Sequence, residues 1–156
     1  MGIKVPGSIA IAADHNGVSL KAHLINYLTS LGCQVVDLGT NSSEVVDYPY
    51  LCHRLAKQVL SGGVDRGVMI GGSGQGETIA LNKIKGVRAG LCNSLFDAEI
   101  SSGNNNANIL VLAGKVLSPE FAEEILNLWL NTPFRGGVHQ KRLDLISMLE
   151  AGEELN

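Results

Sequence analysis

Short apolar runs alternate with amphipathic stretches along the chain, and this alternation limits the possible folds more than any other feature. Short apolar runs are typical of buried strands, whereas apolar residues spaced three or four apart indicate helices. Strands that alternate with helices predict a parallel sheet with helices on both faces. The predicted strands cover residues 9–13, 34–38, 67–70, 87–92 and 108–113, and the clearest predicted helices cover 20–31, 49–60, 119–131 and 139–150.

We expect a three-layer, doubly wound α/β fold with five parallel strands in the order 2-1-3-4-5 and a C-terminal helix. No repeat or linker divides the sequence, so residues 1–156 are predicted to form one domain with peripheral tails at 1–7 and 151–156. Ligands of such sheets bind at the carboxyl ends of strands 1 and 3, where the strand order reverses. Two polar, glycine-bearing segments follow these strands, Asp14 to Gly17 and Gly71 to Glu77.

The segment from Gly71 to Glu77, called the glycine loop below, has four glycines in its first six residues. Such a loop lets backbone N–H groups approach an anion closely. It lacks the Gly-x-Gly-x-x-Gly spacing of dinucleotide sites, and Glu77 stands where a phosphate-binding loop has lysine. One alternative is a plain tight turn in which Glu77 only complements a helix dipole. Donors beside a carboxylate instead favour a general base and an anion that forms during a reaction.

Other polar residues are weaker candidates for a site. Asp14 and His15 follow the first strand, although such a pair can also be a helix cap beside a surface imidazole. His139 and Arg142 share a predicted helix face and could hold a phosphate together with Lys115, but the same spacing is typical of a solvated helix. No spacing of ligands indicates a metal site.

Composition excludes several functions. The net charge is −3 and there is no basic block, so nucleic acid is not an expected partner. No apolar run approaches the roughly 18 residues that a membrane span needs. Three widely spaced cysteines favour reduced thiols and a cytoplasmic location.

An ordered set of motifs resembles the type B ribose-5-phosphate isomerase family, which includes galactose-6-phosphate isomerase subunits. The motifs are Ala13-Asp14-His15-Asn16-Gly17, Asp47-Tyr48-Pro49, the glycine loop, Ala80-Leu81-Asn82-Lys83, Asn105-Asn106-Ala107 and Gly136 to Arg142. Each motif alone is weak, but their order is specific. The resemblance implies an isomerase of the pentose phosphate pathway that interconverts ribose 5-phosphate and ribulose 5-phosphate through a cis-enediolate, without metal or organic cofactor. It also implies a homodimer or homotetramer whose sites use residues from two chains.

The same resemblance implies a role for each matching residue. Glu77 is the expected base, because Gly71 stands where another branch of the family has a cysteine base. Ser73 and the N–H groups from Gly72 to Gly76, including that of Gly74, would stabilise the enediolate. The remaining expected substrate contacts are Asp14, His15, Tyr48, Asn105, Lys115, His139 and Arg142.

Two positions depart from the family pattern. Asn104 replaces a histidine assigned to opening of the furanose ring, and an amide cannot exchange a proton near neutral pH. Ring opening could fall to His15 or His139, proceed unassisted, or be avoided by use of open-chain substrate. Val138 replaces a phosphate-binding arginine, which leaves Arg142 and Lys115, with Arg135 as a further candidate.

Three alternatives to a pentose-phosphate isomerase stay open. The chain could isomerise a six-carbon sugar phosphate, such as allose or galactose 6-phosphate. It could be a non-catalytic sugar-phosphate-binding partner subunit, since two family residues are missing. A nucleotide-binding, flavodoxin-like domain is the third.

Overall fold

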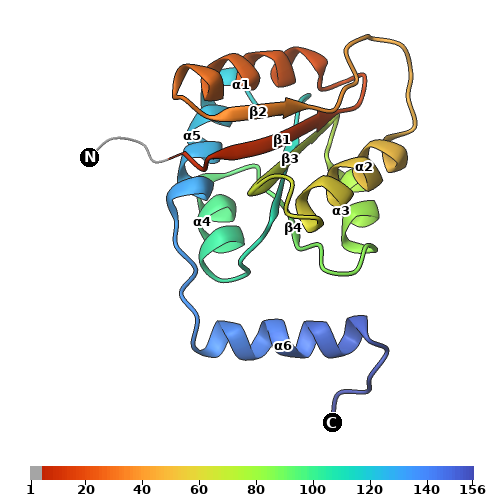
Figure 1. Cartoon of the computed structure of the whole chain (residues 1–156), viewed down its shortest axis with the longest axis vertical. Helices are drawn as coiled ribbons and strands as arrows, with labels where there is room; N and C mark the ends of the chain where they lie inside the picture. Colours follow the sequence, from red (N-terminus) through yellow and green to blue (C-terminus); the bar gives the residue numbers. More distant parts are fainter. Residues whose placement is uncertain (1–4) are drawn as a thin grey trace.

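A computed structural model of the chain describes residues 5–156 and contains five strands and six helices (Figure 1). The strands are β1 (Ser8–Ala13), β2 (Gln34–Asp37), β3 (Arg66–Gly71), β4 (Ala89–Leu91) and β5 (Ile109–Ala113). The helices are α1 (Val18–Ser30), α2 (Tyr48–Leu60), α3 (Gln75–Asn82), α4 (Leu95–Gly103), α5 (Pro119–Asn131) and α6 (Val138–Glu150). The predicted strands and the C-terminal helix are confirmed. The predicted N-terminal tail, residues 1–7, lies partly outside the described residues.

The strands are parallel and lie in the order β2-β1-β3-β5-β4, so the predicted order 2-1-3-4-5 is wrong at its last two positions. All five residues of β5 are apolar and buried, as a strand with neighbours on both sides requires. β4 has only three residues, all partly exposed, and includes Gly90, which suits the edge of a sheet. This order places the turn after β5 directly beside the glycine loop after β3.

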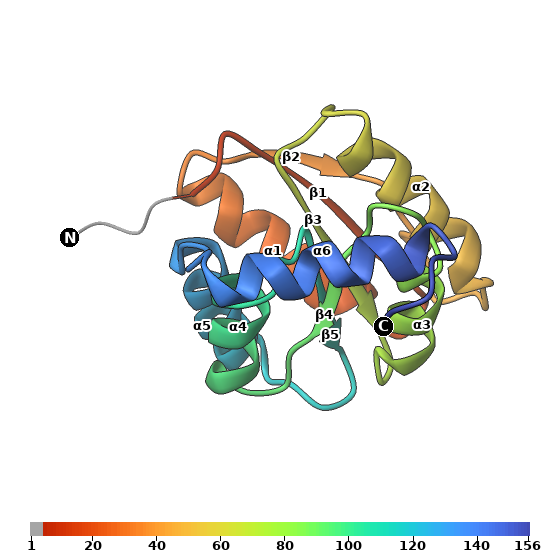
Figure 2. The same ribbon diagram turned by 90° about the horizontal axis from the view of Figure 1, so that it is seen from below.

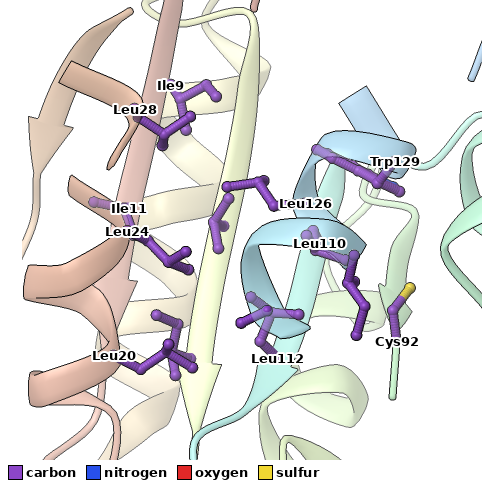
Figure 3. Packing of buried hydrophobic residues seen from close by; sticks show 14 of the residues in the cluster. Ile9, Ile11, Leu20, Leu24, Leu28, Cys92, Leu110, Leu112, Leu126 and Trp129 are labelled. Atoms are coloured by element: carbon purple, nitrogen blue, oxygen red, sulfur yellow. The ribbon is translucent and has the colours of Figure 1, made fainter. Parts of the chain in front are cut away.

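Helices α1, α4 and α5 cover one face of the sheet, and α2 and α3 cover the other (Figure 1). The chain passes from β3 through α3 to the edge strand β4 and returns through α4 to β5. Right-handed crossovers in opposite directions put α3 and α4 on opposite faces. Figure 3 shows the core under α1 and α5, where Leu24 packs near Ile11 and the buried Trp129 and Leu126 lie near Leu110.

Helix starts follow from local chemistry. Ser118 precedes α5, and its hydroxyl accepts a hydrogen bond from the N–H of Phe121 at 3.2 Å. Pro119 then occupies the first helical position, where its missing N–H leaves no donor unpaired. Ser94 caps α4 in the same way through the N–H of Asp97 at 3.1 Å. These caps fix where each helix leaves the end of the preceding strand.

Helix α6 lies apart from the two helical layers (Figure 1) and, seen from below, runs across the molecule near β4 (Figure 2). Glu150 accepts a hydrogen bond from the N–H of Gly86 at 2.9 Å, and Leu143 is buried. A cavity of about 700 Å³ separates α6 from β4 and α4, and its apolar lining includes Leu91, Phe96, Ile100, Leu143, Ile146 and Leu149. One chain therefore covers the apolar face of α6 only in part. Within residues 5–156, no helix combines the length and apolarity needed to cross a bilayer.

Candidate active site

Three loops meet at the carboxyl edge of the sheet, as predicted for the loops after β1 and β3. The N–H of Asp14, after β1, donates to the carbonyl of Ile70 in β3 at 3.0 Å. After β5, the N–H groups of Gly114 and Lys115 donate to the carbonyls of Gly71 and Gly72 at 2.8 and 3.0 Å. The glycine loop is therefore held on both sides by its neighbours.

The glycine loop runs from the last residue of β3 into the first turn of α3. Gly74 is the N-cap of α3, and the hydroxyl of Thr78 donates to its carbonyl at 2.7 Å. The N–H groups of Gly72, Ser73 and Gly74 find no acceptor within the part of the chain that the structure describes. Free N–H groups at a helix start form a place where a negative oxygen is stabilised.

The Glu77 carboxyl group occupies the space above Gly71. A Cβ atom on Gly71 would lie only 2.2 Å from Cδ of Glu77 and 2.3 and 2.4 Å from its two oxygens. Only glycine at position 71 leaves room for the carboxyl group in this position. Glu77 is 4% exposed although it was predicted at a helix start, where a carboxylate is usually solvated.

The surroundings of Glu77 favour its protonated form. Burial, above all, raises the pKa of Glu77, because a charged carboxylate is poorly stabilised away from water. Its own backbone N–H opposes this shift, whereas the nearby carboxyl group of Asp14 adds to it. A base with a raised pKa holds a removed proton more readily and can return it to the substrate.

Asp14, His15 and Asn16 form a hydrogen-bonded cluster next to the glycine loop. Asp14 is buried and accepts from the backbone N–H of Asn16 at 2.8 Å. The Asn16 side chain lies 3.3 Å from both the other Asp14 oxygen and Nε2 of His15. It also lies against Gly72, at 3.3 Å from where a Cβ would stand. Sequence reasoning missed Asn16 as a site residue, although its place between Asp14 and Gly17 was the available signal.

Tyr48, Ser73 and Lys115 lie at the same edge. The Tyr48 hydroxyl oxygen is 2.5 Å from the position that a Cβ on Gly76 would take, so a glycine is needed there for close approach. Ser73 is exposed, and its hydroxyl accepts from the N–H of Gln75 at 3.3 Å. The Lys115 side chain is exposed beside the loop to which its backbone is bound.

The other predicted residues lie elsewhere in the chain. Asn104 and Asn105 connect α4 to β5, and such a connection lies at the amino edge of a parallel sheet. His139 and Arg142 are on α6, which lies apart from the two helical layers (Figure 1). One chain therefore does not bring these four residues to Glu77.

Arg135 is bound at this amino edge. Its Nη1 donates to the Asn104 side-chain oxygen at 2.6 Å, and its Nη2 pairs with Glu99. The backbone N–H of Arg135 also donates to the carbonyl of Gly103 at 2.9 Å. The Arg135 guanidinium, a further candidate phosphate ligand in the sequence, is thus a partner of Asn104.

The cysteines are buried and free. Burial raises the pKa of both Cys52 and Cys92 to about 12. The Cys52 thiol, in α2, donates to the backbone carbonyl of Glu77 in α3 at 3.8 Å and so links the two helices. Among residues 5–156, no three His, Cys, Asp or Glu side chains gather closely enough to hold a metal ion.

A comparison with protein families adds an independent observation. The profile of the Ribose/Galactose Isomerase family matches residues 9–146. The chain belongs to this family. The predicted resemblance is confirmed, and the loops that form the carboxyl edge all lie within the matched residues.

Relatives in the Ribose/Galactose Isomerase family match nearly the whole chain. Ribose-5-phosphate isomerase B of Escherichia coli is 39% identical over 142 residues, which cover 91% of this chain and 95% of the relative. The structure of a ribose 5-phosphate isomerase from Thermotoga maritima is 42% identical with a TM-score of 0.88, covering 90% of this chain and 97% of that chain. The isomerase B of Mycoplasma genitalium, solved with bound ribulose 5-phosphate, is 35% identical with a TM-score of 0.89, covering 95% and 99%.

Proposed function

We propose that the chain is an aldose-ketose isomerase that interconverts ribose 5-phosphate and ribulose 5-phosphate, with Glu77 as the general base. The observation that carries the proposal is the position of the Glu77 carboxyl group, buried above Gly71 beside a loop of free N–H groups. The names of the family relatives support the substrate.

The chemistry requires one mobile proton and a stabilised oxygen. Removal of the C2 proton from the open aldose gives an enediolate with its negative charge on O1. Return of that proton to C1, with transfer of a proton from O2 to O1, gives the ketose. Glu77 carries the carbon-bound proton, and its raised pKa suits a group that must both accept and return it.

The remaining residues of the carboxyl edge bind and orient the sugar phosphate. The N–H groups of Gly72, Gly74 and Gly76, with the Ser73 hydroxyl, stabilise the charge that develops on oxygen. Asp14, His15 and Tyr48 orient the sugar hydroxyl groups. Lys115 supplies a cation at the rim. The proton-transfer centre is thus contained within one chain, with no metal or organic cofactor assigned to it.

We further propose a homodimer or homotetramer in which each site takes residues from two chains. Asn104, Asn105, His139 and Arg142 lie away from the carboxyl edge of their own chain. Exposed apolar side chains mark both regions: Val45, Tyr50, Ile79, Phe96 and Val116 on segments that begin at the carboxyl edge, and Val138, Leu145, Ile146 and Leu149 on α6. A second copy that covers both apolar sets would bring His139 and Arg142 to the opposite site.

Two further proposals concern the whole chain. We propose that residues 1–156 act as a single isomerase domain, and the family profile spans residues 9–146 of it. We propose a cytoplasmic location, which the three free cysteines support because oxidising compartments favour disulfides.

The base is tested by Glu77→Gln, which keeps the shape of the side chain and removes its basicity. The variant should lose most turnover, about 100-fold or more, yet still bind ribose 5-phosphate. The measurement is exchange of the C2 proton with solvent, followed together with substrate affinity. Glu124→Gln on α5 is the control for loss of a carboxylate elsewhere. Exchange at the wild-type rate in Glu77→Gln would remove this residue from the role of base.

The shared site is tested by mixing two inactive variants. Glu77→Gln and Arg142→Ala damage different halves of a shared site, so a mixed dimer contains one intact site and one doubly damaged site. After subunit exchange, the equimolar mixture should recover about one quarter of wild-type activity, because half of randomly formed dimers are mixed. No recovery in an exchanging oligomer would contradict shared sites.

Substrate choice is tested with the same purified protein. The family description names galactose as well as ribose, so six-carbon substrates are the second candidate. Comparison of kcat/KM for ribose 5-phosphate, allose 6-phosphate and galactose 6-phosphate decides between them. Binding without isomerisation of any of the three would favour the non-catalytic partner subunit.

A further inference from the structure

Lys21 is a buried cation in α1 with a complete set of partners. Its side chain is 2% exposed, and lysine is almost never buried unless it is paired. The ammonium group lies 2.6 and 2.7 Å from the two oxygens of Asp37 and 2.6 Å from the side-chain oxygen of Asn41. Three N–H donors therefore meet three acceptors. We call these three residues the Lys21 cluster.

The Lys21 cluster holds the start of the connection between β2 and α2, residues 38–47. Asp37 ends β2, and its carboxylate also accepts from the N–H of Gly39 at 2.9 Å. The carbonyl of Gly39 accepts from the N–H of Ala13 at 2.8 Å, and the N–H of Thr40 donates to the carbonyl of Ala13 at 2.8 Å. Both the N–H and the carbonyl of Ala13 therefore bind the connection, and Ala13 directly precedes Asp14.

The far end of the connection contacts His15. The backbone N–H of Val46 donates to Nδ1 of His15 at 3.4 Å. Tyr48 follows two residues later with its hydroxyl against Gly76. The position of the connection therefore decides how two candidate site residues are presented.

We propose that Lys21 is a positioning residue of the active site: the Lys21 cluster anchors residues 38–47 so that the Val46 N–H contacts Nδ1 of His15 and Tyr48 stays against Gly76. The value of this positioning for binding a sugar phosphate rests on the proposed isomerase function. Lys21 itself is buried and contacts no substrate. Its ammonium group acts only through the backbone that its acceptors carry.

The test compares Lys21→Met, which keeps the long stem but removes the ammonium group, with the wild-type chain. Two NMR signals report the proposed linkage without any need for activity: hydrogen exchange of the Val46 amide, and the ¹⁵N resonance of His15 Nδ1, assigned with His15→Gln. In Lys21→Met, exchange at Val46 should accelerate about tenfold or more, while the amides of Ile11 and Met69 in the sheet keep their protection. The Nδ1 resonance should move toward that of a nitrogen without a hydrogen bond.

Two further variants keep the test decisive. Glu123→Gln changes the partner of His23, another polar side-chain contact of α1 at 2.6 Å, but on the side that faces α5. It should leave both NMR signals unchanged. If Lys21→Met does not fold, Asn41→Ala removes one exposed acceptor of the cluster and should shift the same signals in the same direction. Unchanged signals in a folded Lys21→Met or, failing that, in Asn41→Ala would overturn the proposal.

Activity is measured separately, so that the two proposals fail in different ways. If the isomerase function holds, kcat in Lys21→Met should fall about tenfold through misplacement of His15 and Tyr48. If the NMR signals changed but kcat stayed at the wild-type value, Lys21 would still anchor residues 38–47, but this anchoring would not contribute to catalysis. A wild-type chain without isomerase activity would refute the proposed function and leave the NMR result to decide the structural linkage.

Discussion

Gly71→Ala should inactivate the protein by moving Glu77. The added methyl group would lie 2.2 Å from Cδ of Glu77, whereas ordinary contact between such atoms begins at 3.4 Å. The carboxyl group must therefore move by about 1.2 Å, unless the backbone moves instead. A displacement of about 1 Å at a reacting group lowers a rate by roughly 100-fold. Overpacking of this kind also lowers the free energy of unfolding by about 1–3 kcal/mol.

Steady-state kinetics with ribose 5-phosphate and urea denaturation measure both effects. We expect kcat to fall about 100-fold with little change in KM, because the proposed sugar contacts at Asp14, His15 and Tyr48 remain. Gly63→Ala is the matched control, since its added methyl group meets only Gln58, at 3.2 Å from the side-chain nitrogen and 3.3 Å from the backbone carbonyl oxygen. It should leave kcat unchanged.

The double variant Gly71→Ala/Glu77→Ala separates the steric effect from a general effect on the loop. Without the carboxyl group, the added methyl group has free space, so the stability lost in Gly71→Ala should be largely regained. A kcat for Gly71→Ala within threefold of wild type would refute the reasoning. The reasoning would also be refuted if the double variant lost as much free energy of unfolding as the two single variants lose together.

Further predictions concern pH, thiols and ring opening. Because burial raises the pKa of Glu77, kcat should fall on acidification at a higher pH than an ordinary glutamate, with its pKa of about 4.3, would give; an acid limb at that ordinary value would contradict the assignment. The folded state then binds the Glu77 proton more tightly than the unfolded state does. The stabilisation from this proton is therefore complete below the pKa of Glu77 in the unfolded state, and it is lost as the pH rises through the pKa in the folded state. Urea denaturation should show that Glu77→Gln gains stability relative to wild type over this pH range. Because the pKa of Cys52 and Cys92 is raised to about 12, both stay as unreactive thiols at pH 8, and iodoacetamide at that pH should leave activity intact. If iodoacetamide inactivated the protein and bound substrate protected it, a cysteine base would be indicated instead. Asn104→His should raise the rate on cyclic ribose 5-phosphate where ring opening limits turnover. It should also lower the melting temperature, because the amide oxygen that binds Arg135 is lost. An unchanged or lower rate would show that the histidine does not assist ring opening.

Much of the fold could be predicted because strands and helices differ in the spacing of their apolar residues. Ile9 to Ala13 reads as a buried strand in the sequence and is one. The positions of β4 and β5 were predicted wrongly because spacing does not encode which strands pair. Composition did hold the answer: the run from Ile109 to Ala113 is wholly apolar, whereas the segment around Gly90 is short and interrupted.

The candidate site was predictable only where topology decides it. The meeting of Asp14 with the glycine loop follows from the carboxyl ends of β1 and β3, and the hydrogen bond between Asp14 and Ile70 is consistent with it. The same topological rule places Asn105, which precedes β5, at the other edge of the sheet. The burial of Lys21 was not predictable, because a lysine within a helix is usually solvated.

The space shared by Gly71 and Glu77 has an evolutionary consequence. A side chain added at position 71 first would displace the carboxyl group, and a substitution at position 77 first would remove the proposed base. An exchange between a thiol at position 71 and a carboxylate at position 77 thus begins, by either single step, with loss of the carboxyl group from its present position. Descendants of a chain like this one should keep both residues or exchange both, so the pair should be inherited as a unit.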